Sequence, residues 1–211
     1  MTLADVVDPF PRLPLEPGAA LLPTELARVP YVFVDDGLVV VRAAFPDSAR
    51  RTITGHAGPG AVILPPGPDE VLVALTHAQV VLLSTEICDD LLASPEAAGL
   101  LLEAVAESLR QQHDALASMA RLHHVDRIRQ KLIQLARDHG RVGRDGIRLD
   151  FPLTHDLLGE MTGSARETVT RALEELRREG FVVRRGRTYS VHVPPEDLGL
   201  TRVCAGGFCE T

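Results

Sequence analysis

The chain has 211 residues, 45% of them hydrophobic, and a formal net charge of -7. This length suits one large domain or two small ones, and we expect two. No apolar run approaches the roughly 18 residues of a membrane span, and the N-terminal MTLADVVDPFPRLP lacks the order of a signal peptide. Three cysteines are too few for a disulfide framework, which agrees with a reducing compartment. We therefore expect a cytoplasmic protein with no membrane partner.

The charge is distributed unevenly along the chain. From Arg121 to Val193 there are 15 Arg and Lys against 10 Asp and Glu, a surplus of 5, while the remainder holds 7 against 19, a deficit of 12. A local basic surplus is a possible footprint for a polyanion such as a nucleic acid. On charge alone, a solvated basic face explains it equally well.

The first part of the chain reads as a small antiparallel roll. Short β-branched runs are broken by Gly, Pro and Asp: YVFV, GLVVVRAAF, RRTITGH, AVILPP, EVLVAL and QVVLLS. Many short strands at this spacing predict a roll or barrel. Together with the helices further along, they predict an α+β protein with a roll domain over residues 1–93.

A long helix is expected over residues 94–123. Ser94 precedes a helix-favouring proline, and apolar residues then recur with a seven-residue period, interrupted by one glutamine. The seam comprises Leu102, Val105, Leu109, Gln112, Leu116 and Met119. An apolar seam of this kind is expected to pack against another element, either the chain's own roll or the same helix of a second copy. Because a small roll cannot cover a helix of about 42 Å, we favour a parallel two-fold homodimer.

Residues 124–195 have the pattern of a further domain, followed by a tail over 196–211. VDRIRQKLIQLARDHG predicts a helix with Gly140 as its C-cap, and RVGRDG reads as a turn. Thr154 can cap the next helix, which Gly163 ends tightly. Short helices joined in this way are typical of a helix-turn-helix.

The stretch GSARETVTRALEELRREG predicts the second helix of that motif. Ser164 stands three residues before Glu167, a spacing that predicts a capping box. Helical periodicity places Ala165, Val169, Ala172, Leu173 and Leu176 on one buried face. FVVRRGRTYSVHV then reads as two strands, so the region is expected to be a winged helix-turn-helix.

The opposite face of this helix carries groups that match base edges. Arg166, Glu167 and Arg171 lie on its first two turns, where an arginine fork can bind guanine and a carboxylate can accept from cytosine. Wing arginines and nearby hydroxyls suit phosphates. For that role we assign Thr154, Ser164, Thr168, Thr170, Arg184, Arg185 and Arg187. Exposed i, i+4 ion pairs on a solvated helix are the plainer interpretation of the same charges.

LTHDLLGEMTGSARETVTRALEELRREGFV resembles the winged helix-turn-helix of the CRP/FNR regulators, and Arg166, Glu167, Thr168, Val169 and Arg171 match the R-E-T-V-x-R core of that family. The order of roll, long helix and winged domain is also similar, over about residues 19 to 193. The resemblance implies a homodimeric transcription regulator that reads a palindromic site with half-sites similar to TGTGA. It also implies a roll of the cyclic-nucleotide-binding type, and contact with RNA polymerase where the regulator activates.

The roll departs from the cyclic-nucleotide binders of that family. In place of their Gly-Glu cassette and phosphate-holding arginine stands GPGAVILPPGPDEVLVALTHAQVVLLS, and no Lys or Arg occurs between Arg51 and Arg110. A cyclic phosphate would meet Asp69 and Glu70 without a cation to offset its desolvation. We therefore expect no cyclic-nucleotide cofactor.

Other sensing chemistries stay open as alternatives. Cys204 and Cys209 form a C-x4-C pair in the tail that could ligate a metal with Cys88 or form a redox disulfide, although a tail with incidental thiols is the simpler interpretation. Haem or zinc ligation by His113 or the His123-His124 pair is conceivable.

Catalysis is not expected from the sequence. Walker, G-x-S-x-G, H-E-x-x-H and G-x-G-x-x-G motifs are absent, and His56 and His77 lack nearby paired ligands for a metal site in the roll. A protein-interaction module whose helix-turn-helix no longer binds DNA is the remaining rival.

Overall fold

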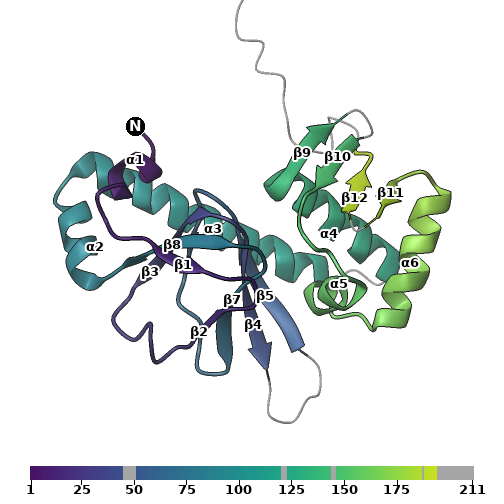
Figure 1. Cartoon of the computed structure of the whole chain (residues 1–211), viewed down its shortest axis with the longest axis horizontal. Helices are drawn as coiled ribbons and strands as arrows, with labels where there is room; N and C mark the ends of the chain where they lie inside the picture. Colours follow the sequence, from purple (N-terminus) through teal and green to yellow (C-terminus); the bar gives the residue numbers. More distant parts are fainter. Residues whose placement is uncertain (45–50, 120–122, 144–145, 187, 194–211) are drawn as a thin grey trace, which may run out of the picture.

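A computed structural model describes residues 1–44, 51–119, 123–143, 146–186 and 188–193. The described chain forms an amino-terminal roll, a long helix that runs along it, and a carboxyl-terminal winged domain (Figure 1). Among the described helices, none combines the length and the apolar character that crossing a membrane requires.

The roll consists of two antiparallel sheets that enclose an apolar core. One sheet has the order β1-β8-β3-β6 and the other β2-β7-β4-β5. Their bounds are β1 Leu13–Leu15, β2 Ala20–Leu21, β3 Tyr31–Asp36, β4 Val39–Ala44, β5 Arg51–Ala57, β6 Val62–Ile63, β7 Glu70–Ala74 and β8 Ala78–Leu83. Val34, Leu72 and Val80 are fully buried between the sheets. The predicted roll and α+β class are thus confirmed.

Three helices pack around one end of the roll. The helices α1 (Leu3–Val7) and α2 (Thr85–Leu92), which the sequence pattern did not predict, share an apolar cluster with the start of α3 (Pro95–Met119). The hydroxyl of Ser94 accepts a 3.4 Å hydrogen bond from the Ala97 amide, so the predicted start of the long helix is confirmed. At 25 residues, α3 is about 37 Å long.

The winged domain contains α4 (His124–His139), α5 (His155–Thr162) and α6 (Arg166–Arg178) over a sheet of order β11-β12-β10-β9. Its strands are β9 Gly140–Gly143, β10 Gly146–Leu149, β11 Val182–Arg185 and β12 Thr188–Val191. Thr154 caps α5 by accepting from the Leu157 amide at 3.1 Å, and Gly163 adopts the left-handed conformation at its end. Both features agree with the sequence prediction.

The predicted capping box at Ser164 is wrong. Ala165 is the N-cap of α6 and makes no side-chain cap bond, while Ser164 lies buried beneath the turn. Its Oγ is 3.5 Å from the Thr162 carbonyl oxygen and 3.3 Å from Nδ1 of His124. The left-handed residue before it turns this hydroxyl inward, so the helix begins without a side-chain cap.

The ends of the segment RVGRDG belong to the paired strands β9 and β10, and residues 144–145, where the turn is expected, lie outside the described residues. Gly140 does end α4, but with φ of -85° rather than a left-handed value. A Cβ there would lie 2.2 Å from Ile147 Cγ2 and 2.3 Å from the Ala136 oxygen. Close packing, not backbone conformation, is therefore what requires glycine at this position.

The roll and the winged domain share one apolar core. Leu38, Val40, Ile53 and Val73 of the roll pack in the same cluster as the buried residues of α4, α5 and α6. Beside this cluster, Arg42 Nε lies 2.9 Å from a carboxylate oxygen of Glu160 on α5. The two parts therefore meet through a continuous packed junction, and the boundaries expected at 93/94 and 123/124 stay predictions.

Candidate functional site

The helix α6 is amphipathic, with one face in the core and one in solvent. Val169, Ala172, Leu173 and Leu176 are 0–4% exposed. The side chains assigned to base reading lie on the other side: Arg166, Glu167 and Arg171 are all exposed. The helix thus presents an accessible charged face on the first turns after the tight turn at α5.

A hydrogen-bonded chain links α5, α6 and the wing beneath this face. Thr170 Oγ1 donates to the Arg166 carbonyl oxygen at 2.9 Å, so it can accept from His155 Nδ1 at 2.8 Å. His155 Nε2 in turn can accept from the Tyr189 hydroxyl at 3.1 Å. Burial, followed by the charges of Arg184 and Arg166, lowers the pKa of His155, in keeping with a neutral ring.

Basic groups surround a surface hollow of about 360 Å³ between α5, α6 and the wing. Arg166 and Arg184 both line it, and Arg166 Nη1 is held 2.9 Å from Asp156 Oδ2 at its rim. Arg184 lies over the Tyr189 ring, 5.6 Å from its centroid, and donates to the Gly186 carbonyl oxygen at 3.1 Å. The fold therefore positions both guanidinium groups near the start of α6.

The hydroxyls assigned to phosphates differ in accessibility. Thr154 is exposed, Thr168 and Thr170 are half-buried, and Ser164 is only 9% exposed. The exposed wing residues include Arg184 and Arg185, whereas Arg187 lies outside the described residues. All these phosphate roles stay predictions, and Ser164 is the assigned hydroxyl whose Oγ is turned into the protein.

The apolar seam of α3 divides into two rows. Leu102, Leu109 and Leu116 repeat every seven residues along the helix, and they are 69%, 52% and 68% exposed. Val105 is half-buried against the cluster at the end of the roll, and half-buried Gln112 lines hollows beside β5. Met119 is the last residue of the helix. The row formed by Leu102, Leu109 and Leu116 is therefore exposed to solvent in the single chain.

A second hollow, of about 440 Å³, lies between the roll and α3. Its walls are formed mainly by apolar and neutral groups, including Val41, Thr54 and Leu116, with Glu70 as the charged residue. The carboxylate of Glu70 accepts from Thr54 Oγ1 at 2.8 Å and from the Gly67 amide at 2.9 Å. Within the described part of the chain no Arg or Lys lines this hollow, so it offers no cation to an anionic ligand.

The cysteines of the sequence analysis are not brought together in the described structure. Cys88 is buried, and its burial, together with the smaller effect of the Asp89 charge, raises the pKa of its thiol. The thiolate form, which is the one that binds metals, is therefore disfavoured. Cys204 and Cys209 lie outside the described residues.

A group of residues that sequence reasoning missed lies at the junction of the two domains. His56 of the roll meets His139 and Asp138 at the end of α4. Burial lowers the pKa of both imidazoles. The sequence gives no sign of this group, because Asp138 and His139 lie 82 and 83 positions after His56.

Comparison with known proteins supports the interpretation of the winged domain. A family model of the Crp-like helix-turn-helix domain matches residues 126–196. The Global nitrogen regulator of Synechocystis is 32% identical over 100 residues, 47% of this chain and 44% of the relative. A CRP-like cAMP-activated global transcriptional regulator of Mycobacterium tuberculosis is 26% identical over 165 residues, 75% of this chain and 73% of the relative. The first of these matches spans about half the length of its relative.

Solved structures share the fold of the whole chain. FixK2 from Bradyrhizobium japonicum superimposes with a TM-score of 0.72 at 21% identity, covering 93% of this chain and 99% of that one. A CRP-family transcriptional regulator from Thermus thermophilus gives 0.71 at 23% identity, covering 89% and 96%. The matches therefore show a Crp-like helix-turn-helix domain at residues 126–196, and the solved structures show that the chain has the fold of CRP/FNR-type regulators.

Proposed function

We propose that this chain is a homodimeric, sequence-specific DNA-binding regulator of transcription. The observation that carries the proposal is the solvent face of α6, where Arg166, Glu167 and Arg171 are exposed beside the arginines of the wing. Arginine forks match the N7 and O6 acceptors of guanine, and a carboxylate accepts from the cytosine amine. The assigned hydroxyls and wing arginines would then hold phosphates and set the orientation.

The proposed dimer rests on the exposed leucine row of α3. Dimerisation about a two-fold axis parallel to α3 would bury this row and present two α6 helices to one face of a duplex. Their half-sites would lie in successive major grooves, about 34 Å apart from centre to centre. Contact with RNA polymerase is part of the proposal for any promoter that the protein activates.

The hollow of the roll argues against control by a cyclic nucleotide. A bound cyclic phosphate would lie near the Glu70 carboxylate, and among the residues that the structure describes no Arg or Lys lines the hollow to compensate its charge. The Mycobacterium tuberculosis relative is described as cAMP-activated, and we infer that this chain differs from it in that respect. Micromolar binding of cyclic AMP, measured by calorimetry, would contradict the inference.

Selection of bound sequences from a random duplex pool tests both specificity and dimerisation. We expect a palindrome whose half-sites have the spacing given above. Arg171→Ala should cost about 1–3 kcal/mol at one base pair and relax the preference there. Arg185→Ala should weaken binding to all sequences alike and flatten the salt dependence.

Arg110→Ala is a charge-matched control, because Arg110 lies on α3 and pairs with Glu107. Equal affinity for selected and scrambled duplexes would refute specific reading. Binding that is absent, or insensitive to salt, would instead favour a protein-interaction module.

A further inference from the structure

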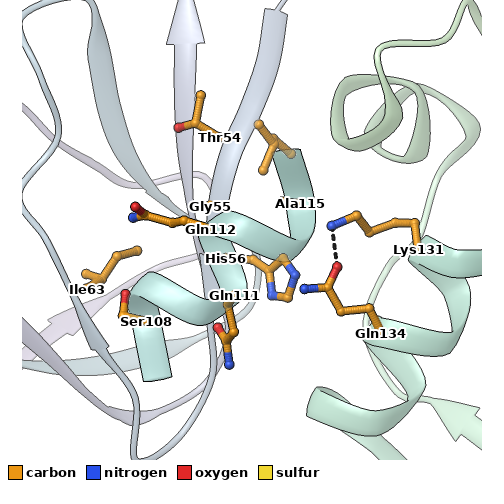
Figure 2. A pocket seen from close by; sticks show the side chains of 11 residues that line it. Thr54, Gly55, His56, Ile63, Ser108, Gln111, Gln112, Ala115, Lys131 and Gln134 are labelled. Carbon is orange, nitrogen blue, oxygen red and sulfur yellow. Dashed lines mark hydrogen bonds between the residues drawn. The ribbon is translucent and has the colours of Figure 1, made fainter. Parts of the chain in front are cut away.

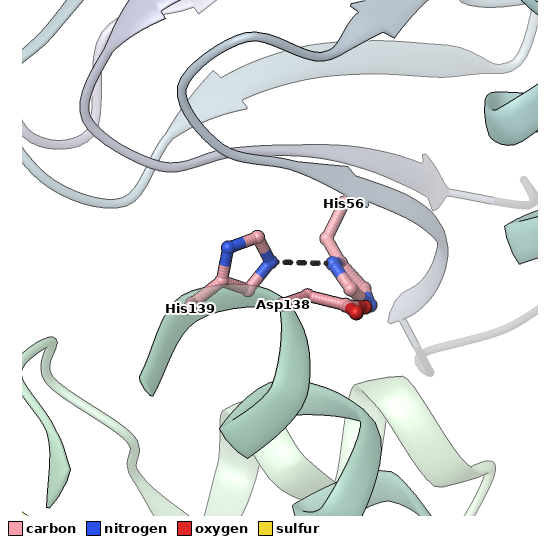
Figure 3. Close-up of side chains that lie close together, drawn as sticks. All are labelled: His56, Asp138 and His139. Atoms are coloured by element: carbon pink, nitrogen blue, oxygen red, sulfur yellow. Dashed lines mark hydrogen bonds between the residues drawn. The ribbon is translucent and has the colours of Figure 1, made fainter. Parts of the chain in front are cut away.

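We propose that His56, Asp138 and His139 form a binding site for a divalent transition-metal ion between the roll and the winged domain. The three residues come from two elements, β5 and the last turn of α4 (Figure 3). One potential ligand atom from each lies within 4.8 Å of the others. These side chains belong neither to the exposed face of α6 nor to the hollow beside Glu70.

The two imidazoles already face each other at a separation close to that of metal ligands. His56 Nδ1 and His139 Nε2 are 2.9 Å apart, and the rings are inclined at 73°. Two nitrogens bound tetrahedrally to Zn²⁺ at about 2.0–2.1 Å are roughly 3.3 Å apart. The contact is a hydrogen bond in which one ring donates to the other, so an ion between the nitrogens would replace that proton and require them to separate by a few tenths of an ångström.

Packing fixes which nitrogen of His139 can take part. A Cβ added to Gly58 would lie 2.6 Å from His139 Nδ1, so the main chain at Gly58 closes that side of the ring. The ring also meets Phe151 edge-on, with centroids 6.3 Å apart. Nε2 is therefore the nitrogen turned towards His56, and the ring orientation is set by its surroundings rather than by the ion.

Asp138 supplies an independent indication of a missing partner. Its Oδ1 lies 3.0 Å from Arg137 Nε, but Oδ2 is buried and has no hydrogen-bond partner. Leaving a buried carboxylate oxygen unsatisfied costs free energy, and buried polar atoms are nearly always paired. A metal ion next to the two imidazoles would satisfy this oxygen.

A small polar cavity lies beside His56, between β5, α3 and α4. A cavity of about 20 Å³ adjoins His56 and is lined by polar groups that include Gln111 and Gln134 (Figure 2). That volume is about what one water molecule needs. Two imidazoles and one carboxylate form a donor set that suits Zn²⁺, Co²⁺ or Ni²⁺ better than Ca²⁺ or Mg²⁺, which prefer oxygen ligands.

Two nearby positive charges oppose the ion: the Arg137 guanidinium, which pairs with Asp138, and the Lys131 ammonium group. Lys131 lines the same cavity, and its Nζ donates to Gln134 Oε1 at 2.6 Å. An ammonium group in this position repels a cation, so its removal should strengthen metal binding. Tighter binding after removal of Lys131 would therefore distinguish an ion held by these three residues from one held elsewhere in the chain.

Occupancy of the site would tie the roll to the DNA-reading domain. The ion would join β5 to the end of α4, whose buried residues pack in one cluster with those of α6. Any effect of the metal on DNA affinity rests on the function proposed above. Metal binding itself does not, so the test measures binding without DNA.

The test uses the full chain with Cys204→Ser and Cys209→Ser, which removes the tail thiols as competing ligands. After chelator treatment, Zn²⁺ alone is titrated by calorimetry and against a chromophoric chelator. We expect one Zn²⁺ per chain, and at least about tenfold weaker binding in His139→Gln and in Asp138→Asn. Lys131→Met should bind Zn²⁺ more tightly.

His77→Gln is the matched control, because His77 is a roll histidine whose side chain is 80% exposed. It should bind Zn²⁺ as the parent does, and circular dichroism establishes that each metal-free variant is folded. The proposal is overturned if the chain with Cys204→Ser and Cys209→Ser binds no Zn²⁺, or if His139→Gln and Asp138→Asn both bind as His77→Gln does. Should one variant fail to fold, the other together with Lys131→Met still decides the outcome.

Discussion

Replacing Leu109 by alanine tests whether the exposed row on α3 is a dimer seam. Leu109 lies midway between Leu102 and Leu116 in this row, each seven residues away. It is 52% exposed in the single chain, so its truncation removes little internal packing. The variant should therefore keep its fold while losing association.

The exposed fraction of Leu109 sets the size of the effect. Leucine to alanine removes about three methyl or methylene groups, each contributing about 0.8 kcal/mol when buried. Since about half of the side chain is still open in the monomer, dimerisation would gain about 1.2 kcal/mol from those groups per copy. Both copies lose it, which is about 2–3 kcal/mol per dimer. The dimer dissociation constant should rise about 30- to 150-fold.

Sedimentation equilibrium over a range of protein concentrations measures this constant directly. Leu92→Ala is the matched control, because Leu92 is 59% exposed but lies on α2, away from the row. Thermal unfolding of both variants establishes that the monomer is intact. If Leu109→Ala and Leu92→Ala dimerise equally well, or if the parent chain is monomeric, the assignment of the seam is wrong.

Two further substitutions probe the winged domain. Gly140→Ala would place a methyl group 2.2 Å from Ile147 Cγ2, so the free energy of unfolding, measured in urea, should fall by about 1–3 kcal/mol. Gly99→Ala is the control, because Gly99 lies on α3 with open space around it, and this change should be neutral or stabilising. Equal effects of the two substitutions would refute the packing argument. The pKa of His155 is lowered by burial and then by Arg184, so the unfolded chain, with its histidine pKa of about 6.5, takes up this proton first as the pH falls. Stability should therefore decline from about pH 7 towards pH 5, and His155→Gln should show a shallower decline in the free energy of unfolding; an unchanged slope would contradict the assignment.

The winged domain was predictable because its signals are local. Apolar residues repeat with helical periodicity along α6, and all of Val169, Ala172, Leu173 and Leu176 are buried as that pattern indicates. The position of Gly163 likewise predicts a tight turn from a single residue type. The R-E-T-V-x-R motif at the start of α6 is a further local signal, because it contains the residues assigned to base reading.

The failures arise where a distant contact overrides a local signal. Ser164 has the spacing of a capping residue, yet the chain direction after Gly163 turns its hydroxyl towards Thr162 and His124. Gly140 looks like an ordinary helix cap, but its need for glycine comes from Ile147 on the facing strand. Neither contact leaves a trace in the local sequence pattern.

The meeting of His56 with Asp138 and His139 was beyond sequence reasoning for a related physical reason. In a regular strand, residues 53 and 56 point to opposite faces, because side chains alternate with a period of two. Here Ile53 pairs with Arg42 and Gly55 with Val41, so Thr54 is an extra residue in β5. The irregularity turns Ile53 and His56 to the same face, and no motif in the strand announces it.

This irregularity also explains how β5 can serve the roll and the winged domain at once. On one face, Ile53 packs in the shared core, and His56 meets the end of α4. On the other face, Thr52 and Gly55 line the hollow between the roll and α3. A ligand that displaced β5 within the hollow would therefore move groups that contact the winged domain directly. The position of β5, rather than a hinge between independent domains, is the structural basis on which this chain could couple the two.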